Sequence, residues 1–231
     1  MYRQTVSLIW LRSKLLLSNP QYMVLILLPY LFIFIYNYLL GSSLSDEYIV
    51  FMTLPILFTI GSGQILSSII SEEKEKNNLK ELQLSGVKEL AYICSSVLFP
   101  LLFSILGIVL FPIILTDIEF SSSYFIINIL TAITVILMFL IVGTISQSVT
   151  QAQIYTFPLL LLTMFLPILS VVNDTISKLA KYTYMSAYIE LFDEVNNSIY
   201  TSSSFFILIV WIILLFIISV ICYKKFIIKI D

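Results

Sequence analysis

The sequence predicts an all-α integral membrane protein with six transmembrane helices. Hydrophobic residues make up 59% of its 231 residues, charged residues make up only 11%, and the mean hydropathy is +1.03. Soluble domains carry about 25% charged residues, so water cannot be the main solvent of this chain. The apolar residues fall into six blocks, each close to the roughly 20 residues that cross about 30 Å of hydrocarbon as a helix.

The six blocks are the expected transmembrane helices. They lie at residues 21–40, 48–70, 92–115, 124–145, 154–172 and 205–223. Each has the length and the apolar character that suit a bilayer, and a short polar turn at residues 41–47 separates the first two. Residues 21–231 are therefore predicted to form a single transmembrane domain.

The first 20 residues mix apolar and basic side chains, which predicts an amphipathic interfacial helix over residues 1–20. The apolar residues that can share one face are Val6, Ile9, Trp10, Leu16 and Leu17. The polar residues that fall elsewhere are Arg3, Gln4, Arg12 and Lys14. The Asn19-Pro20 pair provides a break before the first transmembrane helix.

The distribution of lysine and arginine predicts the orientation in the membrane. Ten of the 12 basic residues precede the first block, separate the second from the third, or follow the sixth. The turns at residues 41–47 and 116–123 have none, and the remaining two, Lys178 and Lys181, separate the fifth block from the sixth. By the positive-inside rule we expect a multi-pass protein of the plasma membrane with both termini in the cytoplasm.

Several function classes are excluded or disfavoured by composition. The net charge of −2 offers no basic surface for nucleic acid, and the absence of histidine removes the commonest metal ligand and general base. No Asp, Glu, Lys or Arg lies inside the six blocks, which argues against an ion-coupled carrier. The chain also lacks a G-x-x-x-x-G-K-[ST] phosphate loop. We therefore expect no catalytic residues, no metal and no cofactor in this chain.

The connection between the second and third blocks is charged and patterned. Its apolar residues Leu79, Leu82, Val87 and Leu90 fall near helical spacing, which predicts a short amphipathic helix. Two surfaces could cover the apolar stripe of this helix. One is the layer of lipid headgroups and the other is a soluble partner, and the pattern favours neither.

The run SEEKEKNNLKELQLSG at residues 71–86, together with six spans of this length, resembles the permease subunits of type-two ATP-binding-cassette exporters. The resemblance implies that this run forms a coupling helix in a groove of the ATPase subunit. The sequence departs from the family pattern at Asn77-Asn78-Leu79, where the family often has Gly-Thr-Leu. The residues to which the resemblance assigns ATPase coupling are Glu72, Glu73, Glu75, Leu79, Leu82 and Gly86.

The same resemblance implies the partners. They are a cytoplasmic ATP-binding-cassette subunit that holds ATP and magnesium, a second permease chain, identical or different, and the lipid membrane. It also implies that the interfacial helix touches the ATPase beside the coupling helix. Spans two and five of such exporters face the second permease across the substrate pathway, and polar groups follow one side of the second block here. We therefore assign Thr59, Gln64 and Ser67 to the pathway.

The connection at residues 173–204 is too long for a simple turn, so we expect one or two short helices that partly re-enter the membrane interface. Tyr182, Tyr184 and Tyr188 are expected at headgroup depth. The resemblance implies that this segment caps the outer end of the pathway. A plain aromatic belt without a gating role is an equally good interpretation.

These features predict a permease subunit of an ATP-driven exporter with an amphipathic or hydrophobic substrate, either peptide or drug-like. The Ile, Lys, Asn and Tyr bias favours a bacterial source, where exporters of peptides and bacteriocin-immunity permeases belong to this class. The alternative is a non-transporting membrane assembly or sensor subunit. An intramembrane protease of the glutamate type, prompted by Glu72 and Glu73, is disfavoured because histidine and a carboxylate at depth are missing.

Overall fold

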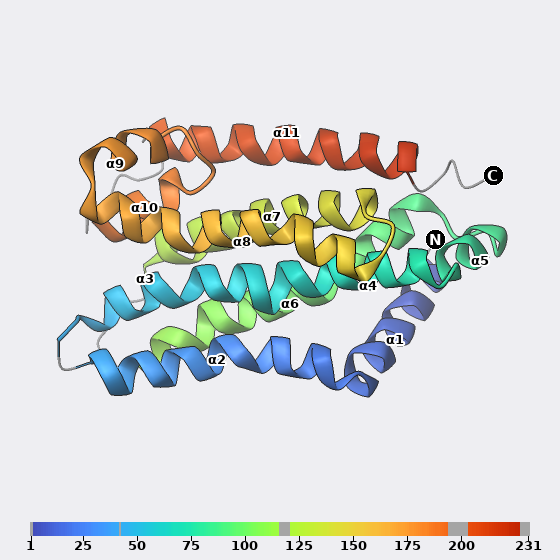
Figure 1. Ribbon diagram of the computed structural model, residues 1–231, viewed down its shortest axis with the longest axis horizontal. Helices are drawn as coiled ribbons and strands as arrows, with labels where there is room; N and C mark the ends of the chain where they lie inside the picture. The colour runs from blue at the N-terminus through green and yellow to red at the C-terminus, as the bar shows by residue number, and fades with distance from the viewer. Residues whose placement is uncertain (1, 42, 116–120, 194–202, 227–231) are drawn as a thin grey trace.

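The computed structural model describes residues 2–41, 43–115, 121–193 and 203–226, and the regular structure in these ranges is entirely helical. Six of its helical segments are long and apolar enough to cross a membrane. They lie roughly parallel in one bundle (Figure 1). The prediction of an all-α integral membrane protein with six spans is confirmed.

The described chain contains six transmembrane segments and four shorter helices. The spans are α2 (Pro20–Leu40), the continuous α3 (Asp46–Ile56), η1 (Leu57–Gln64) and α4 (Ile65–Glu75), then α6 (Glu89–Ile114), α7 (Ser122–Ile145), α8 (Val149–Val172) and α11 (Ser203–Phe226). The shorter helices are α1 (Tyr2–Ser18), α5 (Asn78–Leu84), α9 (Asp174–Ala180) and α10 (Ser186–Asp193).

The bundle has two distinct ends. The start of α1, the whole of α5 and the end of α11 lie at one end, called the α5 end below (Figure 1). The opposite end, called the α10 end, carries α9, α10 and the turn between α2 and α3. The start of α1 and the end of α11 therefore lie at the same end of the bundle. That both chain termini are in the cytoplasm stays a prediction.

Five helices, α2, α3, α7, α8 and α9, begin at a side chain that caps their free backbone N–H groups. Asn19, Ser45, Ser121, Ser148 and Asn173 each accept a hydrogen bond from a backbone N–H two or three residues further on. These residue types are strongly preferred at such positions because they satisfy donors that the helix itself leaves unpaired. Capping also explains why α8 begins five residues earlier than the hydropathy of its sequence predicts.

The second span occupies the centre of the bundle. Its most apolar stretch is 83% buried, against 11% in α2 and 17% in α11, which therefore face lipid over most of their surface. Two glycines permit this close packing. A Cβ atom on Gly63 would lie 2.6 Å from the Phe139 ring of α7, and one on Gly143 would lie 3.0 Å from the Ser67 Cα. The middle of this span, η1, is a π-helix, a form that is frequent at functional sites.

Two tyrosine hydroxyls donate to backbone carbonyls that proline residues leave without an N–H partner. Pro55 has no N–H to offer the Phe51 carbonyl, and the Tyr188 hydroxyl of α10 donates to that oxygen at 2.7 Å. Pro112 likewise frees the Ile108 carbonyl, which accepts from the Tyr124 hydroxyl at 3.1 Å. Backbone groups without partners are costly in a membrane, so these contacts fix α10 against α3 and α7 against α6.

The two short outer helices predicted from the long connection are present as α9 and α10. Of the three tyrosines expected at headgroup depth, only Tyr182 is exposed. Tyr184 and Tyr188 are buried in the main hydrophobic cluster, because their hydroxyls find partners on α8 and α3. Burial raises the pKa of Tyr188 well above its usual value, so its hydroxyl keeps the donating proton.

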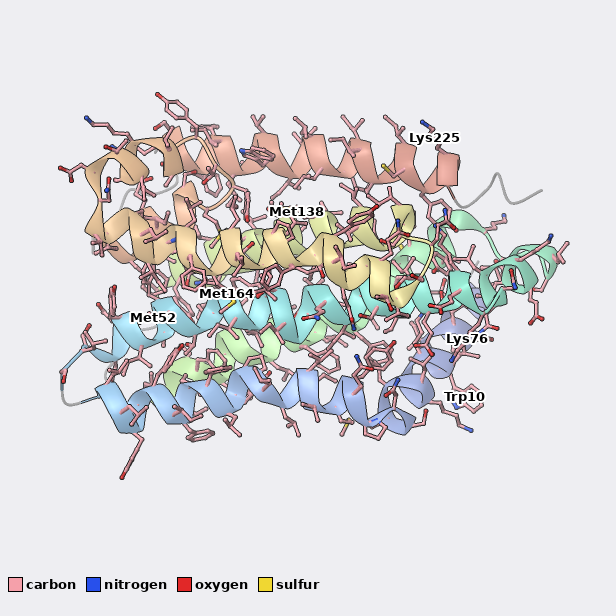
Figure 2. All side chains as sticks on the ribbon, viewed as in Figure 1. Trp10, Met52, Lys76, Met138, Met164 and Lys225 are labelled. Atoms are coloured by element: carbon pink, nitrogen blue, oxygen red, sulfur yellow. The ribbon has the colours of Figure 1, made fainter. Side chains whose placement is uncertain are left out.

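The N-terminal helix differs from its predicted amphipathic pattern. Leu8, Arg12 and Leu16, spaced one turn apart, form the face that is buried against the bundle. Trp10 and Leu17, which were expected beside Leu16, are exposed on the other side (Figure 2). The predicted apolar face is therefore divided between bundle and surroundings, because a partner for the Arg12 guanidinium lies inside the bundle.

Candidate coupling site

The last turn of α4 joins the second span to five neighbouring helices, α1, α2, α6, α7 and α8. The hydropathy pattern places the end of this span near residue 70, but the helix continues to Glu75. It can do so because each charged side chain of the sequence Glu72-Glu73-Lys74-Glu75 has a partner on another part of the chain. The cluster of these four residues and their partners is called the charge cluster below.

Glu73 forms the buried centre of the charge cluster. Its carboxylate is 3% exposed and lies 3.4 Å from the Arg12 guanidinium of α1. The Tyr92 hydroxyl of α6 donates to the same carboxylate at 2.5 Å. The Arg12 guanidinium also lies 4.8 Å from the centre of the Tyr92 ring, within the range of a cation–π contact. Three helices, α1, α4 and α6, are therefore joined at one carboxylate.

Arg12 is an unusually buried cation. It is 1% exposed, and its Nε and Nη1 atoms are buried without a hydrogen-bond partner. Taking a cation out of water costs several kcal/mol, which the attraction to Glu73 offsets only while both partners stay in place. The pair therefore fixes the position of α1 on the bundle. Removing one of the two residues would leave the other charge buried without a partner and would destabilise this arrangement.

Glu72 joins the charge cluster to α2. The Tyr22 hydroxyl donates to its carboxylate at 2.5 Å, and Lys76, four residues further on, lies 2.6 Å away. The negative charge of Glu72 raises the pKa of Lys76, which keeps this exposed ammonium protonated. The Tyr22 contact is partly buried, whereas the Lys76 contact is open to solvent and holds little structure.

The other two residues of the last turn cap neighbouring spans. The Lys74 ammonium donates to the Thr144 carbonyl at the end of α7, at 2.7 Å. The Glu75 carboxylate accepts from the Val149 N–H at the start of α8, at 2.9 Å. A cation at a helix C-terminus and an anion at a helix N-terminus both complement the helix dipole. The end of α4 therefore also holds the turn between α7 and α8.

The coupling helix α5 packs against the chain that carries it. Leu79 is buried in a cluster with residues of α4, α6, α7 and α11, and Leu82 is half-buried against the same cluster. The bundle itself therefore covers Leu79 and part of Leu82, a surface that the sequence pattern had not suggested. Leu84 is 80% exposed and lies on the outer side of α5. The Gly86 carbonyl accepts from the Gln4 side chain of α1 at 2.9 Å, which ties the turn after α5 to α1.

The residues assigned to the substrate pathway lie in and beside η1. Thr59 and Ser67 are buried, and their hydroxyls donate to carbonyls of their own helix, those of Pro55 and Gln64. Gln64 is half-exposed at the last position of η1. The three do not form a continuous exposed surface in a single chain, and their role in the pathway stays a prediction.

Sequence reasoning missed the partners of the acidic residues. Arg12 was expected on the polar side of the N-terminal helix, and neither Tyr22 nor Tyr92 was singled out. A signal was present, because Arg12 stands one turn from both Leu8 and Leu16 in a helix with a buried face. Within the described residues no group of three His, Cys, Asp or Glu side chains could hold a metal ion.

The fold is that of a polytopic membrane protein. The charge cluster joins its central span to neighbouring helices at the α5 end of the bundle. A model of the family described as ABC-2 family transporter protein matches residues 41–222, and the chain belongs to this family. It is thus the membrane-spanning permease subunit of an ATP-binding-cassette transporter, which works with an ATP-binding-cassette subunit. No curated protein and no solved structure matches the chain.

Proposed function

We propose that the chain is one permease half of an exporter that moves an amphipathic or hydrophobic substrate, peptide or drug-like, out of the cell. Two permease chains and two ATPase subunits would form the transporter, with ATP and magnesium held on the ATPases. Charged residues of the described spans occupy only their first and last turns, which supports an apolar cargo driven by nucleotide rather than by an ion gradient.

The observation that carries this proposal is the charge cluster. ATP binding would move the ATPase surface against α5 and the end of α4. Because Glu72, Glu73, Lys74 and Glu75 bind α2, α1, α7 and α8, such a displacement would reach most of the bundle at once. It would also act directly on η1, which continues α4 without a break. The free energy for this conformational change would come from the difference in nucleotide affinity between the two states of the transporter.

The exposed side of α5 is the docking face in this proposal. Lys80, Glu81 and Leu84 are exposed, whereas Leu79 and Leu82 support the helix from below. An exposed leucine flanked by charges suits a partner groove with an apolar centre and a polar rim. Glu72, Glu73 and Glu75 act in coupling by positioning α4, and Gly86 acts through its contact with α1.

The test of docking compares two variants with the same kind of change. Leu84→Asp places a carboxylate on the docking face, and Val172→Asp places one at the last residue of α8, which is 78% exposed at the α10 end. We expect the ATPase subunit to co-purify with Val172→Asp but not with Leu84→Asp. Equal retention of a fully active ATPase by both variants would contradict the proposal.

The direction of transport needs a separate test. The transporter would be reconstituted with ATPases on the outside of proteoliposomes and supplied with fluorescent amphipathic peptides or hydrophobic dyes. ATP-dependent accumulation inside the vesicles is expected for an exporter. Loss of preloaded probe on ATP addition would instead make it an importer. Gln64→Trp should obstruct this transport while ATP binding persists, since Gln64 is the half-exposed member of the assigned pathway residues, whereas Thr59 and Ser67 are buried.

A further inference from the structure

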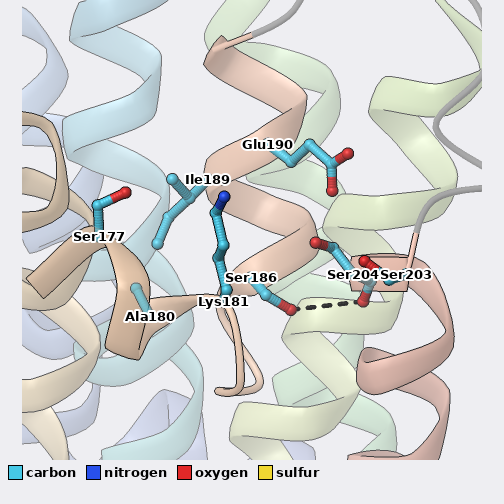
Figure 3. A pocket seen from close by; sticks show the side chains of 8 residues that line it. All are labelled: Ser177, Ala180, Lys181, Ser186, Ile189, Glu190, Ser203 and Ser204. Atoms are coloured by element: carbon cyan, nitrogen blue, oxygen red, sulfur yellow. Dashed lines mark hydrogen bonds between the residues drawn. The ribbon is translucent and has the colours of Figure 1, made fainter. Parts of the chain in front are cut away.

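A polar cavity lies at the α10 end, away from the charge cluster. It occupies about 230 Å³ between α9, α10 and the first turn of α11 (Figure 3). The cavity is level with the last turn of α8 and the first turn of α11, so it sits where a bilayer places its headgroups. The residues that line it are Ser177, Ala180, Lys181, Ser186, Ile189, Glu190, Ser203 and Ser204.

The cavity contains one cation and one carboxylate that do not pair with each other. Lys181 follows the last turn of α9, Glu190 lies on α10, and both side chains border the same space (Figure 3). Neither takes part in an ion pair within the described part of the chain. The Oε2 atom of Glu190 is buried and has no hydrogen-bond partner among the described residues. A buried carboxylate oxygen is costly without a donor, so this geometry favours a ligand that supplies one.

Hydroxyl groups complete the lining. Ser186 donates to the Ser204 carbonyl at 3.4 Å, and this contact holds α10 against the start of α11. Ser203 and Ser204 place further hydroxyls on the side of the cavity that faces Glu190 (Figure 3). Hydroxyls and a carboxylate can accept all three N–H groups of a primary ammonium. The eight lining residues include no aromatic side chain, so they offer no cation–π cage for a quaternary ammonium.

We propose that this cavity binds a zwitterion in which a primary ammonium meets Glu190 and an anionic oxygen meets Lys181. A phosphoethanolamine group has this chemistry, with the two charges separated by two carbons. The volume is below the roughly 300–1,000 Å³ of pockets for drug-sized ligands, so the cavity holds a headgroup rather than a whole amphipathic substrate. The inference does not depend on the proposed export function, whose docking face lies at the other end.

Two sources of the zwitterion can be separated by experiment. The permease, purified with its ATPase subunit, would be titrated with soluble glycerophosphoethanolamine or placed in nanodiscs of phosphatidylethanolamine, phosphatidylcholine or phosphatidylglycerol. Bound ligand would be counted by native mass spectrometry. Saturable binding of the soluble compound assigns the site to a free zwitterion, and binding from phosphatidylethanolamine nanodiscs alone assigns it to a lipid headgroup. Absence of both, or equal binding of phosphatidylcholine, overturns the proposal.

Matched variants show whether binding occurs at this cavity. Glu190→Gln and Lys181→Gln should each weaken binding by about tenfold or more, because each removes a charge-assisted hydrogen bond. Two control variants should bind as the unmodified chain does. Lys178→Gln lies on α9 but outside the cavity lining, and Glu47→Gln is exposed at the α10 end. Equal affinity in all four variants would place the ligand elsewhere and overturn the assignment. Unchanged thermal unfolding of the variants would establish that they are folded.

Discussion

At the α5 end, charged side chains from separate helices pair with one another. At the α10 end, neutral hydroxyls hold the helices, and the described charged side chains form no ion pair with one another. Arg12, Glu73 and Tyr92 represent the first arrangement, and the Tyr188 hydroxyl on the Phe51 carbonyl represents the second. Charges that pair with one another hold the helices together and are not free to bind a ligand. Unpaired charges that face a cavity remain available to a ligand.

The difference has a physical cause in the neighbours of each charge. The acidic run after residue 71 ends the most buried span, so other helices surround it and supply partners. Lys181 and Glu190 lie on short helices at the edge of the bundle, where α9 and α10 leave a cavity between them and α11. The paired charges at the α5 end suit the transmission of motion that we propose there. The unpaired charges at the α10 end suit the recognition of a small ligand.

The largest effect should come from breaking the buried ion pair. Arg12→Met leaves the Glu73 carboxylate buried without its cation, which should lower the free energy of unfolding by about 3–5 kcal/mol. SDS titration of the purified chain in detergent would measure it. The double variant Arg12→Met/Glu73→Leu should regain most of the loss, because no buried charge remains. A double variant as unstable as the single one would contradict this account.

Loss of one hydroxyl at the same end should have a smaller effect. Tyr92→Phe removes the donor to Glu73 while the ring stays against Arg12, so the free energy of unfolding should fall by about 1.5–3 kcal/mol. Tyr38→Phe is the control, because Tyr38 is 89% exposed and its hydroxyl lies outside the bundle. The same titration would compare the two, and equal effects would mean that Tyr92 has no special role.

Loss of a neutral hydrogen bond at the α10 end should lower the free energy of unfolding by less again. Tyr188→Phe leaves the Phe51 carbonyl without the donor that replaces the missing N–H of Pro55, a loss of about 1–3 kcal/mol. Adding Pro55→Ala restores the backbone donor and should recover stability in the double variant. If Pro55→Ala gives no recovery, the hydroxyl does not serve to satisfy the carbonyl freed by the proline.

The smallest effects on stability are expected for the unpaired charges. Lys181→Gln should change the free energy of unfolding by no more than about 0.5 kcal/mol in the absence of ligand, and Glu190→Gln should not lower it, because the change removes a buried charge that has no donor. Lys76→Gln should also be silent, because its contact with Glu72 is open to solvent. A large loss in either cavity variant would mean that these charges hold the fold, and the contrast between the two ends would disappear.

The candidate site was only half visible in the sequence. Glu72, Glu73 and Glu75 could be singled out because a charged run at the end of an apolar block is a local pattern. Their partners could not, because Arg12 is 61 residues away from Glu73 and its helix has charged and apolar residues on several sides. The apolar stripe of Leu79 and Leu82 was recognised, but what covers it was left open until the structure placed it against the bundle.

The sequence by itself determined the helical class and the six spans. Each of these depends on the length of an apolar block or on counting such blocks, which are local properties of the chain. Only the tertiary structure decided that Arg12 is buried and that Tyr188 serves a carbonyl 137 residues away. Such pairings depend on which helices become neighbours, because a polar group in a membrane takes its partner from whatever packs against it.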